Sequence, residues 1–293
     1  MPYMSSNATC GKIEKYEDAI KYIRKKLIEC VYSDIASHKE DKRFMRHLAT
    51  CITKYVPVDL QEFHIFDRIQ DRRVHERKWF LPYMSRNDDC KWLTVGIGGK
   101  VYGIEGQQQV NSDLSFCKLY GIEAINSSHG DYAKYGTVIP HAVGPEDGVH
   151  LLEIYDEGRI NIRTEVMQIR AMHKLLDEYV GSRIIHFATF DIEGYEKKLI
   201  DGIMYQGNIT KNNVIFCQID WELHKDSMYE KLGLKADRVK TLISLIKNSP
   251  YLPILISPQS LYNQHQVILL YVEDSPCKTP FMLEEIFNRT TLC

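Results

Sequence analysis

The spacing of apolar residues changes near residue 85. Before it, apolar side chains recur at three- and four-residue steps, which places them on one face of a helix. Residues 1–85 are therefore predicted to be a helical extension, and the mixed-charge run 66–79 is interpreted as a solvated face or connector. The two apolar series are Tyr16, Ala19, Ile20, Ile23, Leu27, Cys30 and Val31, and Phe44, Leu48, Cys51, Ile52 and Tyr55.

In residues 86–293, short apolar runs alternate with segments of helical spacing, among them 166–180 and 229–248. This alternation indicates βαβ units and predicts an α/β domain with a doubly wound, mostly parallel sheet of seven strands. Only ten residues separate the last two runs, too few for a parallel crossover, so an antiparallel final hairpin is expected. The runs are 92–97, 117–124, 136–144, 183–192, 213–223, 252–257 and 267–272.

The first of these runs, WLTVGIGG at 92–99, ends in glycines. Such a turn brings backbone N–H groups close to a ligand, or it merely packs tightly, and the glycines alone favour neither interpretation. Gly96 and Gly98 fit a dinucleotide fingerprint, but Val101 stands where its third glycine is needed. The next strand ends at Glu123, where a carboxylate suits the two hydroxyls of a ribose; capping of the following helix is the alternative.

Acidic residues and a histidine follow the next two runs. Asp191 and Glu193 end one, and Asp220, Glu222 and His224 end the other. Alternate residues of a strand share a face, and parallel strands end at one edge of a sheet, so these groups are expected to converge. Crowded carboxylates beside an imidazole can provide a general base. Helix capping, a structural histidine and a divalent-metal site remain alternatives, and nothing in the sequence fixes a ligand count.

The stretch FATFDIEGYEKKLIDGI at 187–203 resembles the signature of the FkbM-type methyltransferase family, whose fourth strand ends in an Asp-x-Glu-Gly-x-Glu run. Segments 139–144 and 217–224 resemble the third and fifth strands of that family, and the similarity extends over residues 92–272. The matching residues of the signature are Asp191, Glu193, Gly194, Glu196 and Gly202.

This resemblance implies a Rossmann-like methyltransferase fold, S-adenosylmethionine as cofactor and O-methylation of a small-molecule or sugar-like acceptor. Thr94 stands where the family usually carries an acid that holds the cofactor's ammonium group. A catalytically silent binding or scaffold protein is therefore the rival interpretation. A nucleotide-dependent oxidoreductase is disfavoured by Val101 and the final hairpin. The implied cofactor contacts are Gly96, Ile97, Gly98, Glu123, Ala124, Ala142, Val143 and Asp191, and the implied catalytic residues are Asp191, Glu193, Glu222 and His224.

Two further residues of the motif segments are given structural roles. Glu196 is interpreted as a solvated helix residue, and His141 as structural or adenine-flanking. A metal is not part of the prediction, although the oxygen-and-imidazole set leaves a divalent cation open.

Composition adds few constraints. The formal net charge is −2 and 44% of residues are hydrophobic, which favours neither nucleic acid nor a membrane surface as partner. No apolar run approaches the length of a membrane span and no signal-peptide core is evident, so a cytoplasmic location is expected. The eight cysteines contain no CxxC pair and are predicted to be reduced, buried thiols. The oligomeric state cannot be read from the sequence.

Overall fold

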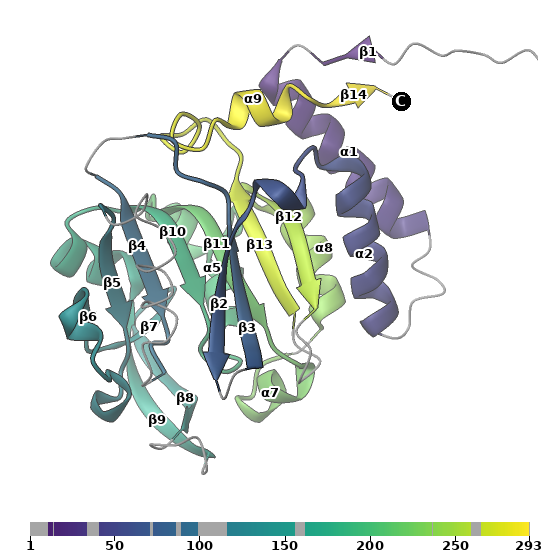
Figure 1. Cartoon of the computed structure of the whole chain (residues 1–293). Coiled ribbons are helices and arrows are strands. Elements are labelled where there is room, and N and C mark those ends of the chain that lie inside the picture. Colours follow the sequence, from purple (N-terminus) through teal and green to yellow (C-terminus); the bar gives the residue numbers. More distant parts are fainter. Residues whose placement is uncertain are drawn as a thin grey trace, which may run out of the picture.

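The computed structural model describes residues 11–13, 15–33, 41–70, 73–85, 89–98, 116–155, 162–235, 237–258 and 265–292. Its centre is a seven-stranded sheet in the order β12-β13-β11-β10-β4-β5-β6 (Figure 1). The strands are β4 (Lys91–Val95), β5 (Lys118–Ile122), β6 (Thr137–Ile139), β10 (Ile184–Phe190), β11 (Ile215–Leu223), β12 (Tyr251–Pro258) and β13 (His265–Tyr271).

The sheet is mixed. Strands β6, β5, β4, β10 and β11 pair in parallel, whereas β13 runs antiparallel to both of its neighbours, β11 and β12. The α/β class and the antiparallel pairing of the last two strands are confirmed. The description as mostly parallel is corrected, because β13 is inserted between β11 and β12 and makes two antiparallel pairings.

The N-terminal region begins with two helices, as predicted, and continues as a β-hairpin. Helices α1 (Tyr16–Ser33) and α2 (Asp41–Tyr55) lie beside β12 and α8 (Arg238–Asn248), at the outer edge of the sheet (Figure 1). Strands β2 (His64–Gln70) and β3 (Arg73–Phe80) pair antiparallel and cross the face of the sheet. The interpretation of 66–79 as a connector was therefore wrong.

Buried polar side chains of β11 hold this hairpin. The Trp79 backbone N–H donates to Asp220 Oδ2 at 2.7 Å. The Leu81 N–H donates to Gln218 Oε1 at 2.8 Å, and Gln218 Nε2 donates back to the Leu81 carbonyl at 3.1 Å. Asp220 and Gln218 are both 0% exposed, and a buried polar group is costly unless it is hydrogen-bonded. The polar face of β11 is therefore matched to the backbone of β3.

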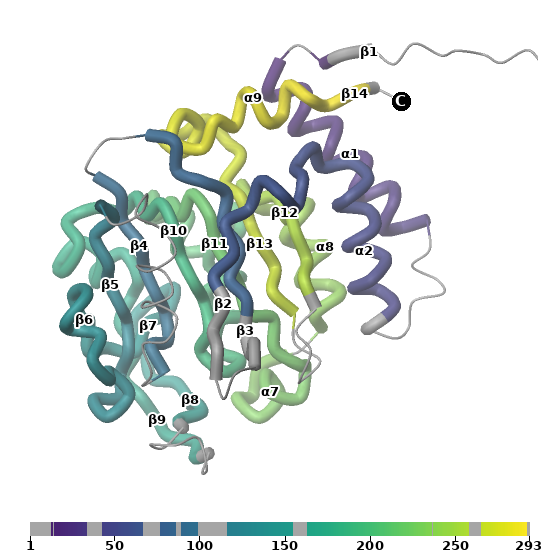
Figure 2. Tube along the Cα trace, in the orientation of Figure 1, coloured from purple at the N-terminus to yellow at the C-terminus, as the bar shows by residue number. Residues whose placement is uncertain are grey.

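The extension and the sheet share one hydrophobic core. Leu27 of α1, Leu48 of α2, Phe80 of β3 and Phe187 of β10 belong to the same buried cluster, with the Phe80 and Phe187 rings 5.3 Å apart. Segments near the two ends of the described chain also meet, since α1 lies beside α9 (Leu283–Phe287) (Figure 2). There the ring of Tyr16 packs against that of Phe287. A domain boundary at residue 85 stays a prediction.

A three-stranded sheet, β7-β9-β8, follows the third strand of the main sheet. The helix predicted over 166–180 begins only at Met172, because residues 162–171 form β9, paired with β8. Apart from β8 and β9, the remaining elements are short. They are β1 (Gly11–Lys12), β7 (Ala142–Gly144), β8 (Gly148–Tyr155), β9 (Ile162–Ala171), α4 (Met172–Leu175), α5 (Glu196–Gly202), α6 (Asn208–Lys211), α7 (Asp226–Lys231), β14 (Thr291–Leu292), 3-10 turns at Leu60–Glu62, Asn126–Ser128 and Tyr132–Lys134, and a π turn at Leu176–Val180.

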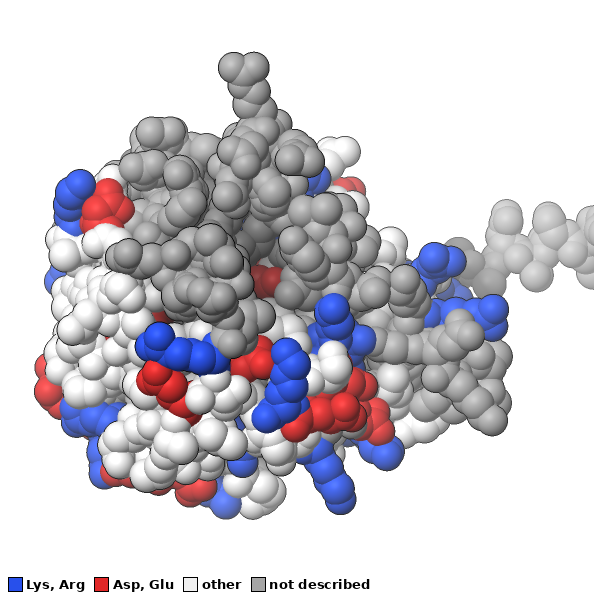
Figure 3. Space-filling model, turned by 90° about the horizontal axis from the view of Figure 1, so that it is seen from below, with Lys and Arg blue, Asp and Glu red and all other residues white. Residues whose placement is uncertain are grey.

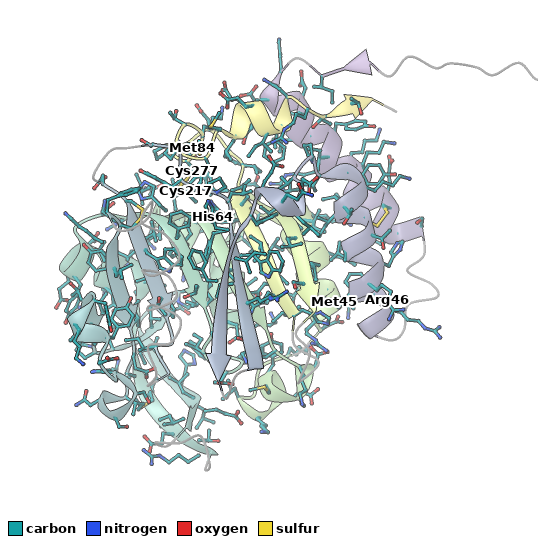
Figure 4. All side chains as sticks on the ribbon, viewed as in Figure 1. Met45, Arg46, His64, Met84, Cys217 and Cys277 are labelled. Atoms are coloured by element: carbon teal, nitrogen blue, oxygen red, sulfur yellow. A yellow bond between two sulfur atoms is a disulfide. The ribbon has the colours of Figure 1, made fainter. Side chains whose placement is uncertain are left out.

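Three disulfides overturn the prediction of reduced thiols. Cys30–Cys51 joins α1 to α2, Cys90–Cys117 joins the segments that precede β4 and β5, and Cys217–Cys277 joins β11 to the chain beyond β13 (Figure 4). The partners are 21, 27 and 60 residues apart, so only the fold reveals them. Cys10 and Cys293 lie outside the described residues.

Disulfides persist in oxidising compartments and are rare in the cytosol. The cytoplasmic location therefore stays a prediction, and the three bonds count against it. Among the described residues, no helix has the length and apolar character needed to cross a membrane.

Removing the Cys217–Cys277 bond should destabilise the chain. Cys217→Ala/Cys277→Ala opens a loop of 60 residues, and chain entropy puts the loss of unfolding free energy at about 4 kcal/mol. Cys30→Ala/Cys51→Ala, whose partners are 21 residues apart, is the matched control with an expected loss of about 3 kcal/mol. Denaturant unfolding without reductant measures both. Non-reducing peptide mapping of the unmodified chain that finds free thiols would contradict the pairing.

Burial lowers the pKa of His186, on β10, to about 4, and the Lys91 ammonium adds to the effect. The folded state therefore favours the neutral ring, whose Nδ1 accepts a hydrogen bond from the Lys91 N–H at 3.2 Å. This contribution to stability is complete above pH 6.5 and is lost as the pH falls toward 4.

His186→Asn keeps an acceptor in place of Nδ1 but does not titrate. Its melting temperature should fall less between pH 6.5 and 4 than that of the unmodified chain. The partly exposed His150, on β8, provides the control substitution to Asn. Identical acid profiles for the unmodified chain and His186→Asn would refute the assignment.

Candidate active site

One buried imidazole lies among four carboxylates at the edge where β10 and β11 end. The His224 side chain is 1% exposed. Its Nδ1 is 2.7 Å from Glu196 Oε1, and its Nε2 is 3.3 Å from Glu193 Oε2, 3.8 Å from Asp191 Oδ1 and 3.9 Å from Glu222 Oε1. The structure thus brings together all four residues that were predicted to be catalytic. Figure 3 looks onto this end of the molecule, where acidic and basic side chains are interspersed.

Glu196 was missed by the sequence analysis. It opens α5, directly after the turn that follows β10, and its side chain is 0% exposed, so the interpretation as a solvated residue was wrong. Its Oε2 accepts a hydrogen bond from the Gly194 N–H at 2.8 Å, while Oε1 pairs with His224. The second glutamate of the DxEGxE run was the available signal, because a helix that begins at a strand end starts inside the site.

The turn between β10 and α5 has an unusual backbone. Glu193 has φ +53°, which is uncommon for a residue other than glycine, and Gly194 has φ +100°. A Cβ at Gly194 would lie 3.3 Å from the backbone of Met228. This conformation sends the Glu193 carboxylate back toward His224, and strain of this kind is often found at functional sites.

The Glu222 carboxylate contacts His224 through one oxygen and two other side chains through the second. Its Oε1 faces His224, whereas Oε2 lies 3.7 Å from Lys78 Nζ and 3.4 Å from the donor Gln266 Nε2. Lys78 comes from β3, so the hairpin contributes a cation that the sequence analysis did not assign. Asp220 shares this face of β11, as alternation predicts, but it accepts its hydrogen bond from the Trp79 backbone and holds the hairpin.

Burial by itself lowers the pKa of His224, but the carboxylates of Glu196, Glu193 and Glu222 outweigh that effect and hold the pKa well above its ordinary value. The carboxylates therefore stabilise positive charge at the ring, and the candidates for a proton acceptor are the carboxylates themselves. The side chains of Asp191 and Glu193 remain 19% and 20% exposed, so a substrate can reach them.

The glycine turn after β4 serves two purposes. Gly96 has φ +93°, and a Cβ there would lie 1.8 Å from the Asp191 carbonyl oxygen, so close packing requires this glycine. Gly98 has φ +68°, and its N–H points to Glu123 Oε2 at 3.4 Å. Gly99 lies outside the described residues.

Glu123 lies between the ends of β4 and β5. Its carboxylate accepts hydrogen bonds from the Ile125 N–H at 3.0 Å and from Gly98, and burial raises its pKa. The 3-10 turn that follows has Ile125 at its N-cap and no side-chain cap. The arrangement thus places the predicted ribose-binding acid beside the glycine turn.

The other predicted cofactor contacts are largely buried, and their role stays a prediction. Ile97 packs on Tyr132. Ala142 and Ala124 belong to a small apolar cluster beside the DxEGxE turn, and Val143 lies in the main core. The side-chain oxygen of Thr94, on β4, is buried beside the buried hydroxyl of Tyr132.

His141 has a structural environment. Its Nε2 lies 3.1 Å from the Tyr179 hydroxyl and 3.3 Å from Arg170 Nη1. These contacts support the structural interpretation of this residue rather than a place in the acidic cluster.

The model of the methyltransferase FkbM domain family matches residues 82–276, about two thirds of the chain. No curated protein and no solved structure matches it. The matched span begins before β4 and ends after β13, so it contains the central sheet, the glycine turn and the four carboxylates around His224. The chain therefore belongs to the FkbM methyltransferase domain family.

Proposed function

We propose that this chain is an S-adenosylmethionine-dependent methyltransferase that methylates a hydroxyl oxygen of a small-molecule or sugar-like acceptor. The observation that carries the proposal is the pair of partly exposed carboxylates, Asp191 and Glu193, beside the buried ring of His224 and next to the glycine turn. Family membership supports methyl transfer in general, and the cluster supplies what an oxygen acceptor needs.

The cofactor side of the proposal rests on three residues. S-adenosylmethionine would supply an electrophilic methyl group on its sulfonium. Glu123 would accept hydrogen bonds from the ribose hydroxyls, because its carboxylate keeps lone pairs beyond the two it gives to backbone N–H groups. Thr94 stands where an acid would hold the cofactor's ammonium group, and its hydroxyl would accept a hydrogen bond there without adding charge.

Methylation of an acceptor hydroxyl requires that its proton be removed. A neutral hydroxyl is a poor nucleophile, and a carboxylate that takes its proton as the methyl group is transferred lowers the barrier. Asp191 and Glu193 are the accessible carboxylates, whereas Glu196 is enclosed and Glu222 is paired with Lys78. His224 would hold the cluster together through its contacts with the four carboxylates.

Thr94 favours one alternative, a relative that keeps the fold and binds a ligand without catalysis. Such a chain would retain Glu123 and the glycine turn but transfer no methyl group. A nucleotide-dependent oxidoreductase has no support in the family match. No nucleic-acid or membrane partner forms part of the proposal.

Glu123→Ala should weaken the binding of S-adenosylhomocysteine about 10- to 100-fold, since hydrogen bonds to a charged group contribute about 1.5–3 kcal/mol. Isothermal titration calorimetry measures this, with NAD as the control ligand. Asp131→Ala, in an exposed pair with Lys134, is the matched control and should bind as the unmodified chain does. Unchanged affinity together with a lower melting temperature would make Glu123 structural.

Glu193→Gln and Asp191→Asn should each reduce turnover about 10²- to 10⁴-fold and change cofactor affinity little, because a general base acts on the acceptor. Transfer of a labelled methyl group to sugars and other hydroxylated small molecules measures turnover. Glu230→Gln, on α7, controls for loss of an acidic side chain elsewhere. A chain that binds S-adenosylhomocysteine but methylates no acceptor in such a screen would favour the silent relative.

A further inference from the structure

We propose that Asp191, Glu222 and His224 form a site for one divalent cation of the Mg²⁺/Mn²⁺ class. His224 Nε2 lies 3.8 Å from Asp191 Oδ1 and 3.9 Å from Glu222 Oε1, and the three atoms lie within 4.8 Å of one another. An ion bonded at about 2.1 Å places neighbouring ligand atoms about 3 Å apart and opposite ones about 4.2 Å apart. Small rotations of these side chains would complete the site.

The two buried ligands, His224 and Glu222, are each oriented by a contact on the side that faces away from the proposed ion. These contacts are separate from the closeness of the carboxylates to one another. His224 is tied through Nδ1 to Glu196, so Nε2 points into the cluster. Glu222 is tied through Oε2 to Lys78 and Gln266, so Oε1 points inward. A histidine that binds a metal through one ring nitrogen usually donates a hydrogen bond from the other to a carboxylate. Such partners orient the ligand atoms before the ion binds.

A buried amide next to Glu222 also fits a bound ion. Gln266 is 0% exposed, its Nε2 donates to Glu222 Oε2 at 3.4 Å, and its Oε1 has no hydrogen-bond partner among the described residues. A buried acceptor is costly unless it receives a hydrogen bond, which a water ligand of the ion would supply. The ion would bind Nε2 of the neutral ring in place of the Nε2 proton, so one positive charge is exchanged for two.

The donor set selects the class of ion. Two carboxylate oxygens suit Mg²⁺ and Mn²⁺, and the single imidazole nitrogen favours Mn²⁺ of the two. The other candidate group in the described chain, Cys30, His47 and Cys51, offers no thiolate because its cysteines are bonded to each other. At Asp191 the cation would polarise and orient the acceptor hydroxyl and leave Glu193 as the proton acceptor, a role that rests on the proposed function.

Binding is tested on the full chain with Mn²⁺ alone, by loss of the electron paramagnetic resonance signal of the free ion. One Mn²⁺ per chain is expected, displaced by excess Mg²⁺. Glu222→Gln and Asp191→Asn should each weaken binding at least tenfold, and Glu196→Gln should weaken it 10- to 100-fold through the orientation of His224. Glu230→Gln, on the neighbouring α7, is the matched control and should leave binding unchanged.

Asp191→Asn keeps the test decisive if a buried substitution prevents folding, because the Asp191 side chain is 19% exposed. No Mn²⁺ binding by a folded chain, or binding unaffected by both Glu222→Gln and Asp191→Asn, would overturn the site. S-adenosylhomocysteine binding measured on the same sample separates the two proposals. If it persists while Mn²⁺ does not bind, only the cation site fails; if Mn²⁺ binds and the cofactor does not, the proposed function fails.

Discussion

The hydrogen bond between His224 and Glu196 is the interaction on which the rest of the site depends. It joins the buried ring of His224, at the end of β11, to a buried carboxylate at the start of α5, and so holds the ends of β10 and β11 together. Neither group can be removed alone without leaving a buried polar or charged partner uncompensated, which typically costs several kcal/mol. The unusual backbone at Glu193 is tolerated because the same imidazole receives its carboxylate.

The same strand, β11, also binds the N-terminal region through the polar side chains on one of its faces. Gln218, Asp220 and Glu222 follow one another on that face and meet Leu81, Trp79 and Lys78 of the hairpin. A strand buried on both faces is normally apolar, so three polar residues in a row require a partner with exposed backbone groups. The hairpin is that partner. Through Lys78 it also places one ammonium group beside Glu222 of the candidate active site. The extension is therefore expected to influence chemistry as well as stability.

The sequence predicted the parts of this structure that follow from local patterns. Apolar runs located the strands, a short connection predicted the antiparallel pair β12–β13, and alternation placed Asp220 and Glu222 on one face. Other features escaped because they depend on contacts between distant segments. Residues 66–79 are rich in charged side chains, so their pattern did not predict the hairpin, which is stabilised by contacts with β11. Glu196 resembles any helix residue until the fold closes around it, and the disulfide partners become neighbours only in the folded chain.

The glycine turn shows how the two halves of the site are joined. Gly96 is needed because β4 and β10 approach so closely that a Cβ would collide with the Asp191 carbonyl oxygen. The Asp191 N–H in turn donates to the Val95 carbonyl at 3.0 Å, so the turn that presents Gly98 and the strand end that presents Asp191 share their backbone contacts. A shift of one must displace the other. Close packing and ligand binding are therefore not competing explanations for these glycines: the packing at Gly96 fixes the distance between the proposed cofactor turn and the carboxylate that faces the acceptor.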